Sequence, residues 1–141
     1  MREYKTASTE ETEALARELA KELRPGDVLA FTGGMGAGKT AFVRGLAQGL
    51  NVSGEVSSPT FALVHEYPGE IPLYHFDMYR IDSLDDLYST GYFDYLEQGG
   101  ILAVEWSENI AAALEEGTIR VNIAVTGENT RTITLEGGGR F

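Results

Sequence analysis

The chain has no cysteine among its 141 residues, which excludes disulfides and thiolate chemistry. Its N-terminus has no charged segment followed by an apolar run, so we expect no secretory signal. No apolar stretch approaches the ~18 residues that a membrane-spanning helix needs. These absences predict a cytoplasmic protein with no membrane association.

Basic residues are scarce, with 11 lysines and arginines against 22 acidic residues and a net charge of −11. A surface of this charge repels phosphate backbones, because affinity for nucleic acids comes largely from Lys and Arg contacts. If the protein serves an RNA pathway, we expect it to meet the RNA only indirectly. The acidity is equally compatible with a simple contribution to solubility.

The length predicts one domain over residues 1–141, and 43% hydrophobic with 23% charged residues is an ordinary globular composition. Two apolar runs, at 28–32 and 101–106, predict buried central strands. The first run leads through a glycine-rich loop into a helical pattern at about 39–50. Strand, glycine loop and helix together are the βα start of an α/β fold.

Other segments have the periodicity of helices and strands. Ser8 and Glu11 have the spacing of a capping box and predict a helix over about 9–23, ended by Pro25 and Gly26. The remaining expected elements are an edge strand at 2–6, a hairpin of 61–67 and 71–79 around Pro68-Gly69-Glu70, helical residues 83–98 broken at Gly91, a short helix at 107–115, a closing hairpin of 118–126 and 131–137, and a frayed tail at Gly137–Gly139.

The glycine-rich loop satisfies the pattern G-x-x-x-x-G-K-[ST]. The candidate nucleotide-binding residues are Gly33, Gly34, Met35, Gly36, Ala37, Gly38, Lys39, Thr40 and Ala41. Glycines let backbone N–H groups point at an anion, and the following helix places its positive end at the same point. Lys39 would reach the β and γ phosphates of ATP, and the Thr40 hydroxyl would bind Mg²⁺. A chance match is the alternative, but the flanking strand and helix favour phosphate binding.

This loop in this context predicts an α/β fold: a single P-loop NTPase domain with a central, mostly parallel sheet, extended by antiparallel strands, and helices on both faces. A P-loop needs a second anchor for magnesium, usually a carboxylate that ends a buried strand. Asp77 after 73–76 and Glu105 after 101–104 both fit. We favour Glu105, because the uniformly apolar run before it predicts a central strand beside the P-loop strand.

Asp77 is then free to orient either the attacking water or a water near the metal, alongside Lys39 and Glu105 as candidate catalytic residues. The alternative for Asp77 is a surface carboxylate paired with Arg80. His65 and His75 fall in strand patterns, where histidine is more often structural, and we assign neither a catalytic role. Trp106 could stack on a base, although core packing is the favoured interpretation.

Four motifs in order resemble the bacterial TsaE family, also called YjeE. They are GGMGAGKT at 33–40, SPTF at 58–61 followed by ALVHEY, HFDMYR at 75–80 and VEW at 104–106. The resemblance extends over nearly the whole chain. It implies an ATPase that supports formation of threonylcarbamoyladenosine at position 37 of tRNAs by acting with the TsaB and TsaD proteins and resetting their complex between turnovers.

Carried over to this sequence, the family's magnesium ligands fall on Thr40 and Glu105 and its essential acidic position on Asp77. Its switch-like segment falls on Ser58, Pro59, Thr60 and Phe61. A Ser-Pro turn entering a strand is the structural alternative for that segment, and with the resemblance we favour a sensor of the γ-phosphate. The lack of an N-K-x-D tetrapeptide, together with the resemblance, favours ATP over GTP.

Two other functions remain open. A small-molecule kinase usually carries arginines on a lid, and residues 81–140 offer only Arg120, Arg131 and Arg140. A nucleotide-gated binding module would differ from an ATPase mainly in how well it stabilises the transition state. An arginine supplied by a partner can change the rate of hydrolysis by a factor of about 10³ to 10⁵. Arg44 and Arg80 are the candidates for that role within this chain, and we expect hydrolysis to be slow alone and faster with the partner proteins.

Overall fold

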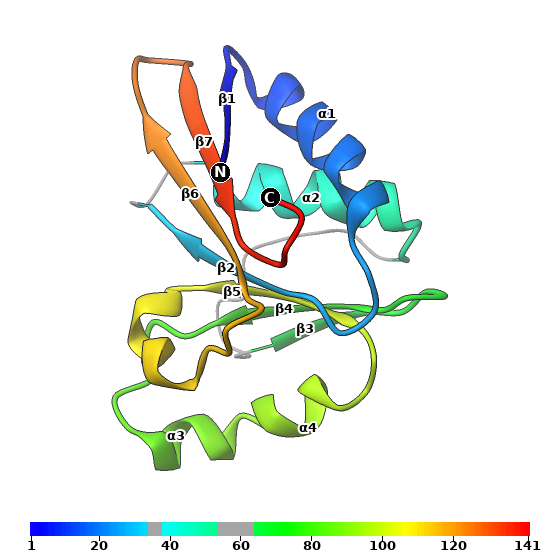
Figure 1. Cartoon of the computed structure of the whole chain (residues 1–141), viewed down its shortest axis with the longest axis vertical. Coiled ribbons are helices and arrows are strands. Elements are labelled where there is room, and N and C mark those ends of the chain that lie inside the picture. The colour runs from blue at the N-terminus through cyan, green and yellow to red at the C-terminus, as the bar shows by residue number, and fades with distance from the viewer. Residues whose placement is uncertain (34–37, 54–63) are drawn as a thin grey trace.

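A computed structural model describes residues 1–33, 38–53 and 64–141 of the chain. The described residues form a seven-stranded sheet in the order β1-β7-β6-β2-β5-β4-β3 (Figure 1). The strands are β1 (Arg2–Thr6), β2 (Val28–Thr32), β3 (Val64–Tyr67), β4 (Leu73–Asp77), β5 (Ile101–Glu105), β6 (Ile119–Val125) and β7 (Arg131–Glu136).

The four central strands β6, β2, β5 and β4 run parallel, and β1, β7 and β3 join antiparallel at the two sides. This confirms the predicted fold class, an α/β fold with a mostly parallel sheet extended by antiparallel strands. It also confirms that β5 lies directly beside β2, since Val28 pairs with Leu102 and Ala30 with Val104. Both strands are buried because helices cover the two faces of the sheet.

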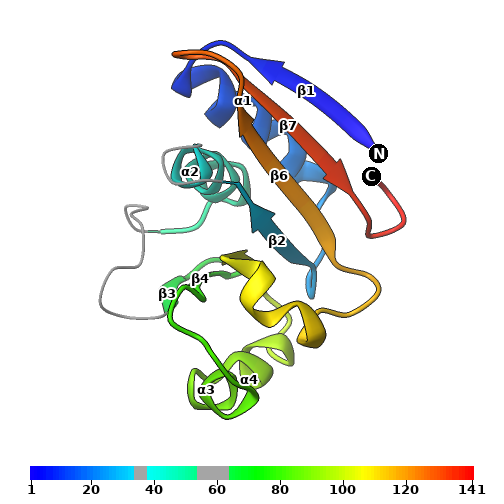
Figure 2. The same ribbon diagram turned by 90° about the vertical axis from the view of Figure 1, so that its left-hand side faces the viewer.

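The helices are α1 (Thr9–Leu19), α2 (Lys39–Leu50), α3 (Leu84–Ser89) and α4 (Tyr92–Leu96), with 3₁₀ helices η1 (Ala20–Glu22) and η2 (Ser107–Ala113). Helices α1 and α2 pack together on one face, whereas α3, α4 and η2 pack on the other (Figures 1 and 2). No helix in the part of the chain that the structure describes is both long and apolar enough to cross a membrane.

The local signals at the helix ends act as the sequence predicts, with one difference. The Ser8 hydroxyl accepts a hydrogen bond from the Glu11 amide at 3.1 Å and so caps α1. The predicted helix over 9–23 is α-helical only to Leu19, and its last turn tightens into η1. The break at Gly91 is confirmed, because this residue has a φ of 81° and separates α3 from α4.

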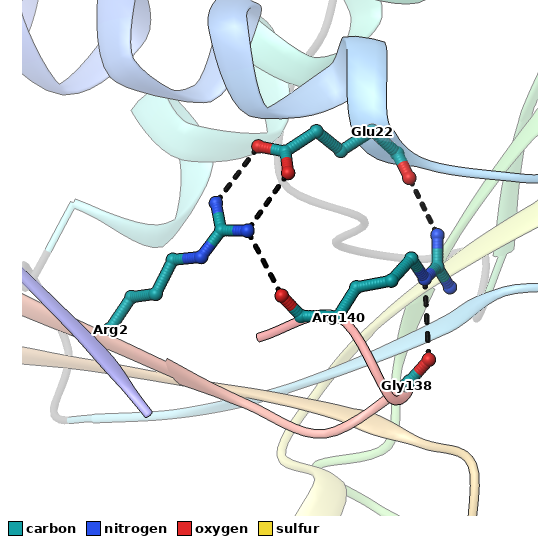
Figure 3. A network of polar contacts seen from close by, with 4 residues as sticks. All are labelled: Arg2, Glu22, Gly138 and Arg140. Carbon is teal, nitrogen blue, oxygen red and sulfur yellow. Dashed lines mark hydrogen bonds and ion pairs between the residues drawn. The ribbon is translucent and has the colours of Figure 1, made fainter.

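The prediction of a frayed C-terminal tail is wrong. Arg140 donates hydrogen bonds to the Glu22 and Gly138 carbonyls and forms a 2.6 Å ion pair with Asp27. Arg2 in turn donates two 2.9 Å hydrogen bonds to the Glu22 carboxylate and one to the Arg140 carbonyl (Figure 3). These contacts order the tail, because charge-assisted hydrogen bonds join it to segments more than 100 positions away in the sequence.

Candidate nucleotide-binding site

The glycine-rich loop begins where β2 ends and finishes where α2 begins. Gly33 and Gly38 both have positive φ, of 133° and 100°, a conformation that costs glycine little. Gly38 caps α2, so the positive end of this helix lies at the carboxyl end of the P-loop strand. Gly34, Met35, Gly36 and Ala37 lie outside the described residues.

Lys39 is the first residue of α2 and has only 7% of its surface exposed. Its Nζ donates a 3.1 Å hydrogen bond to the Gly33 carbonyl and lies 5.3 Å from the centroid of the Trp106 ring. No carboxylate pairs with Lys39 in the part of the chain that the structure describes. A buried ammonium without a counter-charge is costly, and an anionic ligand at this point would remove the cost.

Asp77 and Glu105 end the neighbouring parallel strands β4 and β5 and lie directly opposite one another. Since the carboxyl ends of parallel strands share one edge of the sheet, both carboxylates are at the edge where β2 enters the loop. Glu105 is buried and Asp77 is half-buried. The structure thus brings three of the predicted residues, Lys39, Asp77 and Glu105, to one edge.

Glu105 is held in place by one contact from β4 and one from the residue that follows this strand. Its Oε2 lies 2.7 Å from the His75 Nε2, and its backbone carbonyl accepts a 3.0 Å hydrogen bond from the Met78 amide. Oε1 has no hydrogen-bond partner among the described residues. The sequence missed the contact with His75, which is fully buried, because it depends on the register of β4 against β5.

The structure does not show the alternative interpretation of Asp77 as the partner of Arg80. The Oδ1 of Asp77 accepts a 2.9 Å hydrogen bond from the Tyr79 amide, and Arg80 is exposed. No ion pair joins Asp77 to Arg80 within the described ranges. The second oxygen of Asp77 has no hydrogen-bond partner among the described residues.

Trp106 follows Glu105 with a φ of 57°, which is unusual for a bulky residue and turns the chain sharply at the end of β5. Its half-buried ring packs edge-on against Tyr79 at 4.9 Å between centroids and also faces Lys39. The Ser107 hydroxyl donates a 2.9 Å hydrogen bond to the Phe31 carbonyl and so ties the end of β5 to the end of β2. Trp106 therefore lies half-buried at the margin of the core and beside the site, so the structure shows the favoured core packing only in part.

The structure places the other candidates as follows. Thr40 is half-buried and Ala41 is buried, both in the first turn of α2. Arg44 forms a 3.2 Å ion pair with Glu13 of α1. The switch-like residues Ser58, Pro59, Thr60 and Phe61 lie outside the described residues.

These residues fit a nucleotide with magnesium. The described residues contain no group of three or more His, Cys, Asp or Glu side chains that could hold a metal by themselves. Magnesium in nucleotide sites is usually held by one or two protein ligands together with phosphate oxygens. The hydroxyl of Thr40 and the Oε1 of Glu105, which has no partner among the described residues, would supply those protein ligands, and the Lys39 ammonium would bind the phosphates.

Residues 6–133 match the family model described as "Threonylcarbamoyl adenosine biosynthesis protein TsaE". The chain is 39% identical over 137 residues to the tRNA threonylcarbamoyladenosine biosynthesis protein TsaE of Bacillus subtilis, covering 96% of this chain and 85% of that protein. It is 37% identical to the protein of the same name from Treponema pallidum, covering 91% and 95% of the two chains. The crystal structure of Bacillus subtilis YdiB superposes with a TM-score of 0.81 at 36% identity, covering 98% of this chain and 86% of that one.

Proposed function

The chain belongs to the TsaE family of threonylcarbamoyl adenosine biosynthesis proteins, and from that membership we propose that it is an ATPase that binds ATP with magnesium. In this proposal it acts on the complex of the TsaB and TsaD proteins during threonylcarbamoyladenosine formation at position 37 of tRNAs. Nucleotide binding or hydrolysis resets that complex between turnovers. The protein works in the cytoplasm and meets tRNA only through its partners, in keeping with its net charge of −11.

The observation that carries the proposal is the position of Lys39. Its buried ammonium lies at the start of α2, beside the ends of the strands that carry Asp77 and Glu105. A triphosphate seated on the loop gains the positive end of the helix and the Lys39 charge at once. The same anion supplies the counter-charge that Lys39 lacks among the described residues.

Each candidate residue has its own role in this proposal. Lys39 binds the β and γ phosphates, while Thr40 and Glu105 hold magnesium, which neutralises charge that develops on the transferred phosphoryl group. Asp77 orients the attacking water through its free oxygen. The Trp106 ring lies beside the Lys39 ammonium and packs edge-on against Tyr79, so it covers one side of that ammonium.

Hydrolysis by the isolated chain is slow in this proposal. Arg44, one of the two arginines suggested for transition-state stabilisation, is engaged with Glu13 at 3.2 Å. Arg80 is exposed and extends from the loop after β4. An arginine from a partner protein would therefore increase the rate of hydrolysis. Such arginines increase the rate by a factor of about 10³ to 10⁵ in other phosphoryl-transfer enzymes.

A small-molecule kinase is less well supported. Of the arginines that follow residue 81, Arg140 is engaged with Asp27 and Glu22. Arg120 and Arg131 lie within strands β6 and β7, and neither belongs to a lid. Transfer of phosphate from ATP to a metabolite would favour the kinase over the ATPase.

The proposal is tested by ATP hydrolysis with the wild type and with the Lys39→Ala and Glu105→Ala variants, each with and without TsaB plus TsaD. We expect the partners to stimulate the wild type and both variants to lose activity. Equal rates for the wild type with and without the partners would contradict a partner-dependent ATPase. Tight binding of ATP with no stimulated hydrolysis would favour a nucleotide-gated binding module.

A further inference from the structure

His75 and Glu105 form a buried pair within the sheet. His75 is fully buried and Glu105 is 6% exposed, and the His75 Nε2 lies 2.7 Å from the Glu105 Oε2. A carboxylate only accepts hydrogen bonds, so the proton of this contact is on Nε2. His75 is therefore the donor.

The register of the strands explains why the two side chains meet. His75 is opposite Ala103, and Glu105 is two residues further along β5, so the three side chains share one face of the sheet. Ala103 has only a methyl group, which leaves room for the imidazole ring to lean along the strand toward Glu105. A larger residue at 103 would fill that space.

The other ring nitrogen of His75 indicates that packing alone does not explain a histidine at this position. His75 Nδ1 is buried and has no hydrogen-bond partner in the described ranges of the chain. An unsatisfied buried polar atom destabilises the fold by about 1–3 kcal/mol, so an apolar residue of similar size would suit a purely structural position better. A histidine at this position is explained by what its Nε2 does for Glu105.

We propose that His75 is a positioning residue for magnesium: it holds Oε2 of Glu105 and so directs Oε1 toward the metal or a metal-bound water. This inference rests on the proposed function, because it requires Glu105 to be the carboxylate that holds magnesium. Partners that orient a metal ligand typically change metal affinity by 10- to 100-fold when they are removed. The contact thus tunes the affinity for magnesium and leaves the phosphate contacts of Lys39 unchanged.

Two substitutions separate the hydrogen bond from the burial. In His75→Gln the side-chain amide can reach the position of Nε2 and donate to Glu105. In His75→Asn the amide is one bond shorter and reaches only the position of Nδ1. The matched control is His65→Asn, because His65 is opposite His75 on β3 and bonds to the Tyr67 hydroxyl, not to Glu105.

The experiment titrates magnesium into each variant in the presence of the non-hydrolysable analogue AMP-PNP and follows binding by calorimetry. The fluorescence of Trp106, the single tryptophan of the chain, gives a second readout beside Glu105. We expect His75→Asn to raise the magnesium midpoint about tenfold, with the affinity for AMP-PNP in EDTA unchanged. His75→Gln and His65→Asn should stay within about twofold of the wild type.

Two outcomes would overturn the inference about His75 without affecting the proposed function. One is a magnesium midpoint in His75→Asn equal to that of the wild type. The other is an equal shift of the midpoint in His75→Gln and His75→Asn together with lower melting temperatures, which would indicate a purely structural role. The Glu105→Gln variant separates these from a failure of the proposed function. If AMP-PNP binding by the wild type does not respond to magnesium, or if Glu105→Gln leaves the midpoint unchanged, the magnesium role of Glu105 is wrong and the inference falls with it.

Discussion

Asp77 lies directly opposite Glu105 in the register of β4 and β5, so two carboxylates with different surroundings share one edge of the sheet. Glu105 is buried and bonded to His75, whereas Asp77 is half-buried and bonded to the Tyr79 amide. Two acidic groups in different environments are suited to different tasks. This difference supports assigning magnesium to Glu105 and the attacking water to Asp77.

The Asp77→Asn variant should therefore retain magnesium-dependent binding of ATP and lose hydrolysis. An amide cannot accept the proton of water, and loss of a general base typically lowers the rate by about 10²- to 10⁴-fold. Phosphate release in the presence of TsaB and TsaD measures the rate, and calorimetry measures binding. If Asp77→Asn shifts the magnesium midpoint as far as Glu105→Gln does, the two carboxylates share the metal and the division of roles is wrong.

The Lys39→Met substitution should abolish the response to nucleotide without lowering the stability of the free protein. The buried ammonium has only the Gly33 carbonyl and the Trp106 ring as described partners, so an apolar side chain of similar length removes an uncompensated charge. We expect the free energy of unfolding without nucleotide to rise by about 1 kcal/mol. ATP with magnesium should raise the melting temperature of the wild type but not that of the variant.

The matched control is Lys21→Met, because Lys21 is exposed and, among the described residues, pairs only with Glu18, three residues earlier in the chain. Loss of such a surface pair changes stability by less than about 1 kcal/mol and should not affect the response to ATP. If Lys39→Met instead destabilises the free protein clearly more than Lys21→Met does, Lys39 has an essential structural partner and its charge is not reserved for an anion.

Gly45 of α2 determines how closely this helix approaches α1. A Cβ at position 45 would lie 2.3 Å from the Glu13 carbonyl oxygen and 2.7 Å from the Ala16 Cβ. Gly45→Ala should gain up to about 1 kcal/mol in helix propensity, but overpacking typically destabilises by about 1–3 kcal/mol. We therefore expect a net loss, because both close atoms belong to a packed helix that cannot easily move.

Gly117→Ala is the control for this prediction, since a Cβ there meets nothing within 4 Å. It should be neutral or slightly stabilising, because alanine restricts the unfolded chain. Urea unfolding of the two variants beside the wild type measures the difference. Equal stability of Gly45→Ala and Gly117→Ala would show that α1 can move away from α2 at little cost.

Most of the fold could be predicted from the sequence where the signals are local. Strand β2 and helix α2 begin and end at the residues that the sequence predicts, because an apolar run, a glycine loop and an amphipathic run mark their limits. The order of the tail could not be predicted in the same way. Arg140 is ordered by Asp27 and Glu22, and no local pattern connects residues so far apart in the sequence.

The candidate site shows the same division. Lys39 and Glu105 could be selected as candidates from a loop pattern and from the end of a buried strand, which are both local features. The hydrogen bond between His75 and Glu105 depends on the register of two parallel strands, and alternation within β4 alone does not reveal it. His75 lies two residues before Asp77 and so shares its face of β4, which was the one signal in the sequence for a contact near the site. That signal points to Glu105 only once β5 is placed beside β4.

Tyr92 should make the protein sensitive to alkaline pH. Burial, with a smaller contribution from the negative charge of Glu115, raises the pKa of Tyr92 to about 12. In the unfolded chain tyrosine ionises near pH 10, so above that pH the unfolded state loses its proton first, and stability falls as the pH rises toward 12. Urea midpoints at pH 9 and pH 11 should therefore diverge more for the wild type than for Tyr92→Phe, while the exposed Tyr79→Phe keeps the wild-type slope. If the urea midpoint changes equally with pH in Tyr92→Phe and in the wild type, the prediction is wrong. In that case Tyr92 would ionise equally easily in the folded and unfolded states and would add no dependence on pH.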